Sequence, residues 1–121
     1  MTSLVVDIVP MRAAMLVTVF GEADLATVVH FRECLSTVPG RDTVMETSGV
    51  TLLSAVGLRV VLDLQDRLAA VGARLVLAAP SHQVRRVLAV TELETRLPTE
   101  PTVADALDSL AAGTTNAVPG G

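Results

Sequence analysis

The stretch that decides the fold reads GVTLLSAVGLRVVL, residues 49–62. Val50 to Leu53 form a short apolar run, which is typical of a buried strand. The small residues from Ser54 to Gly57 predict a bend, and beyond it the apolar residues recur at helical spacing. A strand that passes directly into a helix leaves the helix N-terminus at the surface, where unpaired backbone N–H groups can meet an anion or a partner. These residues therefore mark a candidate functional site, with Ser54 as the expected N-cap.

Strands and helices are expected to alternate on both sides of this stretch. The expected strands cover residues 4–9, 13–20, 42–47 with its continuation 50–53, 74–79 and 96–98. The expected helices are one that Asp24 or Thr27 caps and that runs to about residue 38, and three more over residues 56–71, 81–90 and 102–112. In the second helix Asp63 and Arg67 are expected to pair at i, i+4, and in the third Val84, Val87 and Leu88 are expected to face inward. Met11-Arg12 is expected to form a tight hairpin connection, and Ser48-Gly49 a bend. The order β-β-α-β-α-β-α-β-α predicts an α/β fold with a mixed β-sheet, an N-terminal hairpin and about four helices.

One domain is expected, and residues 1–112 carry all of its predicted elements. Half of the 121 residues are hydrophobic, so a sizeable core can form without metals or disulfides. The segment 113–121 has no apolar period and is expected to be a mobile tail.

Composition argues against several classes of function. The net charge is −4, and the nine basic residues are arginines that form no basic stripe, which disfavours binding to nucleic acid or anionic lipid. Phe20 and Phe31 are the only aromatic residues, so nucleic-acid bases would find no stacking platform. No secretory signal and no apolar run of membrane-spanning length is visible, and a cytoplasmic protein is expected.

No catalytic or metal-binding constellation can be assembled from the sequence. Glu22 and Asp24 would suit a paired-carboxylate site, but loop charges and a helix cap explain them better. His30 and His82 are isolated and Cys34 has no second cysteine, so neither a zinc site nor a redox pair is expected. Glycine-rich nucleotide-binding motifs are absent from the sequence. We therefore expect no enzyme activity, no metal and no cofactor.

A series of motifs makes the chain similar to a known family. The chain contains, in order, GEAD at residues 21–24, SGVTLL at 48–53, a Gly57-Leu58 helix start, ARLVL at 73–77 followed by Pro80-Ser81, and VRRVL at 84–88. Each motif is weak alone, but their joint order and spacing are specific. Over residues 4–111 the chain therefore resembles the STAS domain, and in particular the bacterial anti-sigma factor antagonists.

The resemblance implies a non-catalytic interaction module that regulates transcription. Members of that group bind an anti-sigma factor, often a serine kinase, and so release the sigma factor. The kinase phosphorylates a serine in an Asp-Ser-Ser-Gly bend, and the complex then dissociates. In this chain the resemblance and the exposed helix start imply a partner-binding surface made of Gly21, Glu22, Asp24, Ser54, Ala55, Val56, Gly57, Arg59 and Asp63.

The bend departs from the family pattern at the residue that carries the switch. Ser54 stands at the family's aspartate, Ala55 at its phospho-acceptor and Val56 at the following serine. Because Ala55 has no hydroxyl, the resemblance implies partner binding without the usual phosphorylation. Ser54 is the candidate substitute acceptor, and Thr51 a more remote one.

Other interpretations stay open at this point. The bend at residues 54–57 can be a simple strand-to-helix turn. The chain can also be a STAS subunit of a transporter complex, or a protein that binds a small ligand or a nucleotide. The sequence leaves the identity of the partner and the oligomeric state undecided.

Overall fold

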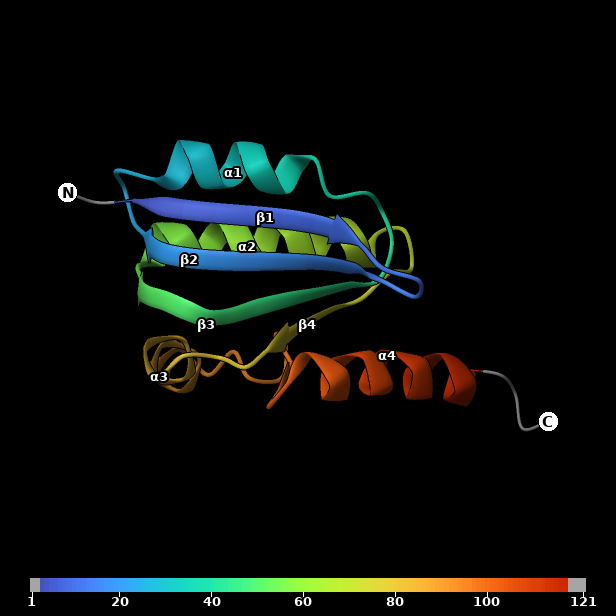
Figure 1. Cartoon of the computed structure of the whole chain (residues 1–121). Helices are drawn as coiled ribbons and strands as arrows, with labels where there is room; N and C mark the ends of the chain where they lie inside the picture. The colour runs from blue at the N-terminus through green and yellow to red at the C-terminus, as the bar shows by residue number, and fades with distance from the viewer. Residues whose placement is uncertain (1–2, 118–121) are drawn as a thin grey trace.

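Five strands form one sheet whose order follows the chain, β1-β2-β3-β4-β5. The computed structural model describes residues 3–117, so residues 118–121 of the predicted tail lie outside the described residues. The elements are β1 Leu4–Pro10, β2 Met15–Ala23, α1 Val28–Ser36, β3 Thr43–Leu53, α2 Ala55–Ala69, β4 Leu75–Ala78, α3 His82–Thr91, β5 Thr99–Glu100 and α4 Val103–Ala117. The hairpin of β1 and β2 is antiparallel, and the later neighbours pair parallel (Figure 1). The predicted α/β fold with a mixed sheet is therefore confirmed.

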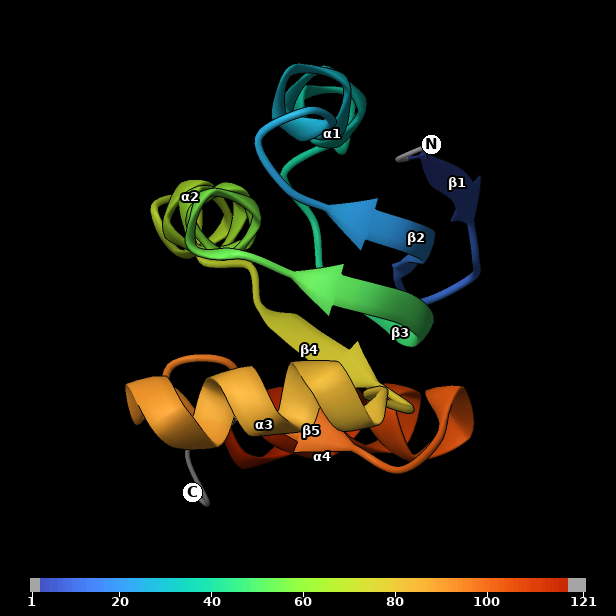
Figure 2. The same ribbon diagram turned by 90° about the vertical axis from the view of Figure 1, so that its left-hand side faces the viewer.

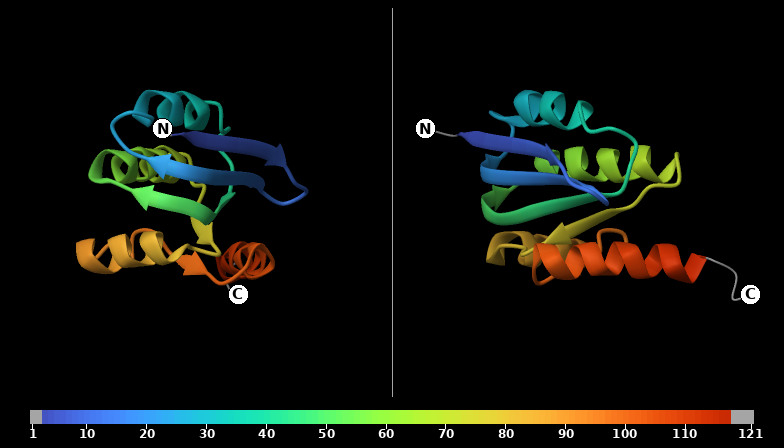
Figure 3. Two further views of the ribbon diagram at one scale, coloured as in Figure 1. Left: turned by 60° about the vertical axis from the view of Figure 1, so that its left-hand side comes forward. Right: turned by 45° about the vertical axis from the view of Figure 1, so that its right-hand side comes forward.

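Two apolar cores cover opposite faces of the sheet. Leu75 and Leu77 of β4 belong to the larger core, into which α1, α2 and α3 send their apolar side chains. Val76 and Ala78, which alternate with them, belong to the smaller core under α4. This division follows from the period of two along a strand, which sends successive side chains to opposite faces. Figures 2 and 3 show α1 and α2 together on one side of the sheet and α4 on the other.

The third strand is continuous, and the predicted bend at Ser48-Gly49 is wrong. β3 runs from Thr43 to Leu53, and its pairing with β2 shifts register twice along the way. Such irregularities let a strand curve without losing its partner. Gly49 is needed at this point, because a Cβ there would collide with the ring of Phe20.

The last strand and the last helix also differ from their predicted bounds. β5 is Thr99–Glu100 instead of residues 96–98, because the N–H groups of Arg96 and Leu97 donate to the carbonyl of Leu93 in a turn that buries the Leu97 side chain. The final helix α4 continues to Ala117, so the prediction of unstructured chain from Gly113 is wrong for the first residues of that segment.

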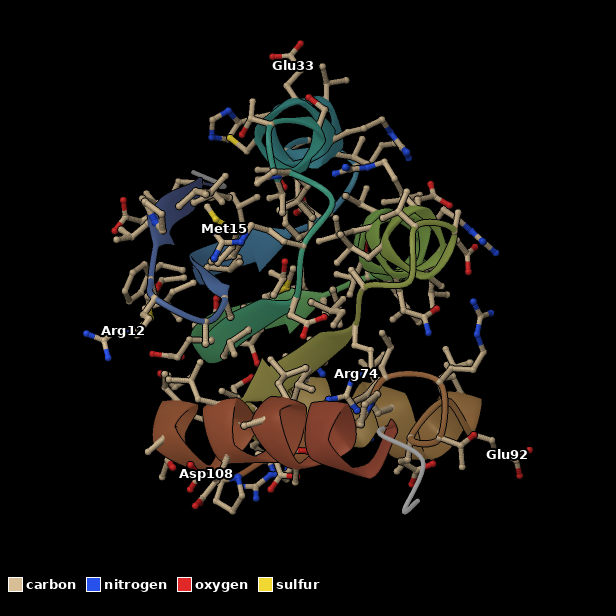
Figure 4. All side chains as sticks on the ribbon, turned by 90° about the vertical axis from the view of Figure 1, so that its right-hand side faces the viewer. Arg12, Met15, Glu33, Arg74, Glu92 and Asp108 are labelled. Carbon is tan, nitrogen blue, oxygen red and sulfur yellow. The ribbon has the colours of Figure 1, made fainter. Side chains whose placement is uncertain are left out.

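The side chain of Arg74 packs against the last helix at the position of Gly113. The guanidinium of Arg74 donates hydrogen bonds to the carbonyls of Ser109, at 3.2 Å, and Leu110, at 2.7 Å. A Cβ at Gly113 would collide with this guanidinium, so the glycine makes room for the contact. Figure 4 shows Arg74 between β4 and α4.

Local signals at the helix ends were predicted correctly. Ser54, Ser81 and Thr102 each accept a hydrogen bond from the amide three residues further on, which satisfies one N–H of each helix start. Gly72 takes a left-handed φ of +77° after α2, as expected for a residue that ends a helix.

We predict that Thr47→Val stabilises the protein. Thr47 is 4% exposed, and among the described residues its hydroxyl is the one buried side-chain polar atom without a hydrogen-bond partner. Removing an unpaired buried hydroxyl while keeping the side-chain shape should raise the free energy of unfolding by about 1–2 kcal/mol. Urea denaturation monitored by circular dichroism measures this change.

Thr43→Val is the matched control, since the equally buried Thr43 hydroxyl donates to the Arg41 carbonyl at 2.8 Å. That variant should lose about 1 kcal/mol. A loss of stability in Thr47→Val as well would mean that the Thr47 hydroxyl has a partner, and would refute the prediction.

Candidate functional site

The bend before α2 is fixed to the end of the neighbouring strand. The backbone N–H of Ser54 and the Ser54 hydroxyl both donate to the carbonyl of Ala23, each at 2.9 Å. The same hydroxyl accepts the N–H of Gly57 at 3.4 Å. One serine therefore ends β3, starts α2 and ties both to β2, which makes the bend more than a free turn.

Residue 57 has to be glycine, because the start of α2 packs closely against the end of β2. Gly57 is buried, and a Cβ there would collide with the carbonyl and the Cβ of Ala23. The helix can therefore start directly against the end of β2. Ala55 and Val56, which precede the glycine, are exposed.

The GEAD segment lies at the same end of the sheet as the bend. Glu22 pairs with Leu52 and Ala23 pairs with Leu53 in the β2–β3 ladder, so the two segments end side by side. Gly21 has a left-handed φ of +104°, and its carbonyl accepts the Thr51 hydroxyl at 3.3 Å. Figure 2 looks onto this end of the sheet.

The role of Asp24 differs from the predicted helix cap. Its carboxylate accepts the N–H of Ala26 at 3.0 Å, within the turn that precedes α1. Thr27 is the residue before α1, but its hydroxyl donates to the Glu22 carbonyl at 2.7 Å and makes no capping bond to the helix. The first helix therefore starts at Val28, directly after Thr27, which is one of the two predicted cap positions, but the side chains of Asp24 and Thr27 hold the preceding turn instead of capping the helix.

Arg59 and Asp63 lie on the side of α2 that faces α1. Asp63 forms ion pairs with Arg32 of α1, at 2.9 Å, and with Arg59, at 3.7 Å. The predicted pair between Asp63 and Arg67 is wrong, because Arg67 donates instead to the carbonyls at the end of α1. The structure thus places all of the predicted partner-binding residues at one end of the sheet and along the adjoining side of α2.

A groove that sequence reasoning missed adjoins the bend on its other side. This α2–α3 groove encloses about 350 Å³ and is lined by Leu53, Ala55, Leu58, Gln83, Arg86, Val87, Val90 and Thr91. Val87 was expected to point inward, and it is half-buried at the groove. Val90 is 76% exposed. A valine outside the apolar stripe of α3 is the signal that could have indicated this surface.

The candidate phospho-acceptors differ in their surroundings. Ala55, which the resemblance described above places at the family's acceptor position, is exposed but carries no hydroxyl. The Ser54 hydroxyl is partly buried and is already engaged in hydrogen bonds to Ala23 and Gly57. Thr51 is exposed. Of the three positions, only Ala55 is exposed without a side-chain hydrogen bond, and alanine cannot be phosphorylated.

Neither a metal cluster nor a membrane-spanning helix is found within residues 3–117. No group of three or more His, Cys, Asp or Glu side chains converges there as metal ligands. No helix in this part of the chain combines the length and the apolar character needed to cross a bilayer.

Comparison with known proteins identifies the family. The model of the STAS domain matches residues 6–106, and the chain therefore belongs to the STAS domain family. An anti-sigma factor antagonist from Mycobacterium paratuberculosis is 26% identical, with 90% of this chain and 95% of that chain covered and a TM-score of 0.76. No curated protein matches the chain.

More distant structures share the fold. The phosphorylated form of the Bacillus cell fate determinant SpoIIAA is 23% identical over 87% of this chain and 98% of that one, with a TM-score of 0.66. The murine anion transporter solute carrier 26 family member A9 is 18% identical over 84% of this chain but only 18% of that one, with a TM-score of 0.72. The same fold thus occurs as a separate small protein and as a small part of a transporter.

We predict that Ser54→Ala destabilises the protein by about 1–2 kcal/mol, because it removes a helix cap together with the bond to Ala23. Ser81→Ala is the matched control, since the Ser81 hydroxyl caps α3 by accepting the N–H of Val84 and makes no other hydrogen bond to the described residues. Its expected cost is about 1 kcal/mol. Thermal and urea unfolding measure both variants, and an equal or smaller loss in Ser54→Ala would argue against the link to β2.

Proposed function

We propose that this STAS domain is an anti-sigma factor antagonist, and that it binds an anti-sigma factor at the end of the sheet where β2 and β3 finish. The 26% identity to the Mycobacterium paratuberculosis antagonist over nearly the whole of both chains supports this choice. The observation that carries the proposal is the bend itself, which is rigidly tied to Ala23 and presents Ala55 and Val56 to solvent.

Apolar side chains around the bend support a protein partner. Val56 is 37% exposed and Leu52 is also 37% exposed, while Leu25 in the GEAD turn region is 78% exposed. Together with the α2–α3 groove they form an uneven apolar surface at one end of the sheet. Apolar surfaces of this kind mark sites of protein association.

The domain acts by binding and catalyses no reaction itself. The Asp24 carboxylate is engaged in its own turn, where it accepts the N–H of Ala26 at 3.0 Å and the hydroxyl of Thr27 at 3.4 Å. Regulation by phosphate on residue 55 is absent, because alanine cannot accept it. The antagonist therefore stays competent to bind whether or not its partner is a kinase.

Ala55→Asp is expected to weaken binding to the cognate anti-sigma factor by at least about tenfold, because a close interface would bury an unpaired carboxylate. The variant should fold normally, since a carboxylate in the first turn of a helix is favourable. Isothermal titration calorimetry measures the affinity.

Ala104→Asp serves as the matched control. It places the same carboxylate on an exposed alanine in the first turn of α4, on the opposite face of the sheet. Binding should be unchanged there. If Ala55→Asp also binds with unchanged affinity, the bend is not part of the interface.

Incubation with a kinase-type cognate anti-sigma factor and ATP should leave residues 51–57 of the native chain free of phosphate. Ala55→Ser, which restores a hydroxyl at an exposed position, is expected to accept phosphate under the same conditions. Mass spectrometry of the tryptic peptides distinguishes the acceptors. Phosphate on Ser54 of the native chain would refute the proposal that this protein binds its partner without control by phosphorylation.

A further inference from the structure

A second groove lies between α1 and α2 and differs from the apolar one in its charge. It encloses about 190 Å³, and its charged lining residues are Arg32, Asp63 and Arg67, with Arg59 joined to Asp63 by an ion pair. Three of the nine basic residues of an acidic chain therefore line or adjoin a groove that holds one carboxylate. We name this surface the arginine groove.

The charges of the arginine groove are only partly neutralised. Asp63 is shared by Arg32 and Arg59, whose side chains are 53% and 60% exposed. Among the described residues these two guanidiniums have no recorded acceptor besides Asp63. Each guanidinium has five N–H donors, so most donors of both side chains remain available to a ligand.

The third arginine holds the groove together. Arg67 donates to the carbonyls of Leu35 and Val38, each at 2.8 Å, and so links α2 to the end of α1. Its geometry is fixed by these bonds, while its charge adds to the positive potential between the helices.

Other carboxylates on these helices do not neutralise the arginines. Asp66 is paired with Arg96 at 2.7 Å. Glu33 lies on the side of α1 that points away from α2, as Figure 4 shows. The arginine groove is therefore a locally positive surface on a chain whose net charge is −4.

One exposed valine precedes each of the two arginines that pair with Asp63 by about one helical turn. Val29 is 67% exposed and precedes Arg32 by three residues, and Val56 is 37% exposed and precedes Arg59 by three residues. Residues three apart are neighbours on a helix surface. Each helix therefore presents an apolar side chain next to an arginine, a pattern suited to a peptide that carries both apolar and acidic side chains.

We propose that the arginine groove binds an acidic, amphipathic segment of a protein partner, whose carboxylates pair with Arg32 and Arg59 and whose apolar side chains contact Val29 and Val56. This deepens the proposed function, on which it rests, because Arg59 and Asp63 also belong to the partner-binding surface. Carboxylate recognition by forked guanidiniums is favourable in geometry and charge. Nucleic acid is the weaker alternative, because phosphates would leave the valines without a contact.

The test uses a fluorescent peptide of repeating Glu-Glu-Leu-Ala units, with binding followed by fluorescence anisotropy at low and high salt. The peptide should bind, and its affinity should fall as salt rises. A peptide with glutamine in place of each glutamate should not bind. Equal binding of the glutamine peptide, or tighter binding of an oligothymidylate, would overturn the proposal.

Charge-matched variants locate the binding. The double variant Arg32→Gln with Arg59→Gln should weaken peptide binding about three- to tenfold. The control pairs Arg12→Gln with Arg85→Gln, which removes the same charge from exposed arginines outside the groove, and should leave binding unchanged. Equal losses in the two doubles would show only a dependence on net charge and would overturn the proposal.

The variant Asp63→Asn is expected to change the peptide affinity in the opposite direction from the arginine variants. Removing the carboxylate that competes for Arg32 and Arg59 should strengthen peptide binding about two- to fivefold. Weaker or unchanged binding would contradict a role of these arginines toward an acidic ligand. Since none of these assays contains an anti-sigma factor, their failure is distinct from a failure of the proposed function, which Ala55→Asp tests separately.

Discussion

The carbonyl of Ala23 at the end of β2 is the point on which the site depends. It accepts two hydrogen bonds from Ser54, one from the backbone and one from the hydroxyl, and its own residue packs directly against Gly57. These contacts allow α2 to begin at the sheet without an intervening loop. Because the start of the helix cannot move independently of β2, the bend and the GEAD segment form one rigid surface.

Two different surfaces extend from this fixed point along α2. Toward α3 lies the apolar α2–α3 groove, and toward α1 lies the arginine groove with Asp63 at its centre. Apolar contacts supply most of the binding energy in a protein interface, whereas charges determine orientation and partner choice. A partner that contacts both sides of α2 would gain most of its binding energy from the apolar α2–α3 groove. The charges of the arginine groove would determine which partner binds and in which orientation. Ala55 is one of the lining residues of the α2–α3 groove and contributes no charge to either surface.

The sequence allowed much of this site to be predicted, for local reasons. Caps such as Ser54 and Ser81 depend on bonds to amides three residues away, so they can be inferred from neighbouring residue types. Asp63 illustrates the opposite case. Its predicted partner Arg67 is local, but its observed partner Arg32 is 31 residues away, and only the packing of α1 on α2 brings the two together.

By itself the sequence determined the order of the elements, the mixed sheet, the position of the bend and the absence of a hydroxyl at Ala55. These depend on local periodicity, on turn chemistry and on the identity of single residues. Only the tertiary structure decided that β3 continues past Gly49, that α4 passes Gly113 beside Arg74, and that Arg32 of α1 joins Arg59 at Asp63. Each of these depends on contacts between residues distant in the chain, which no local pattern of the sequence encodes.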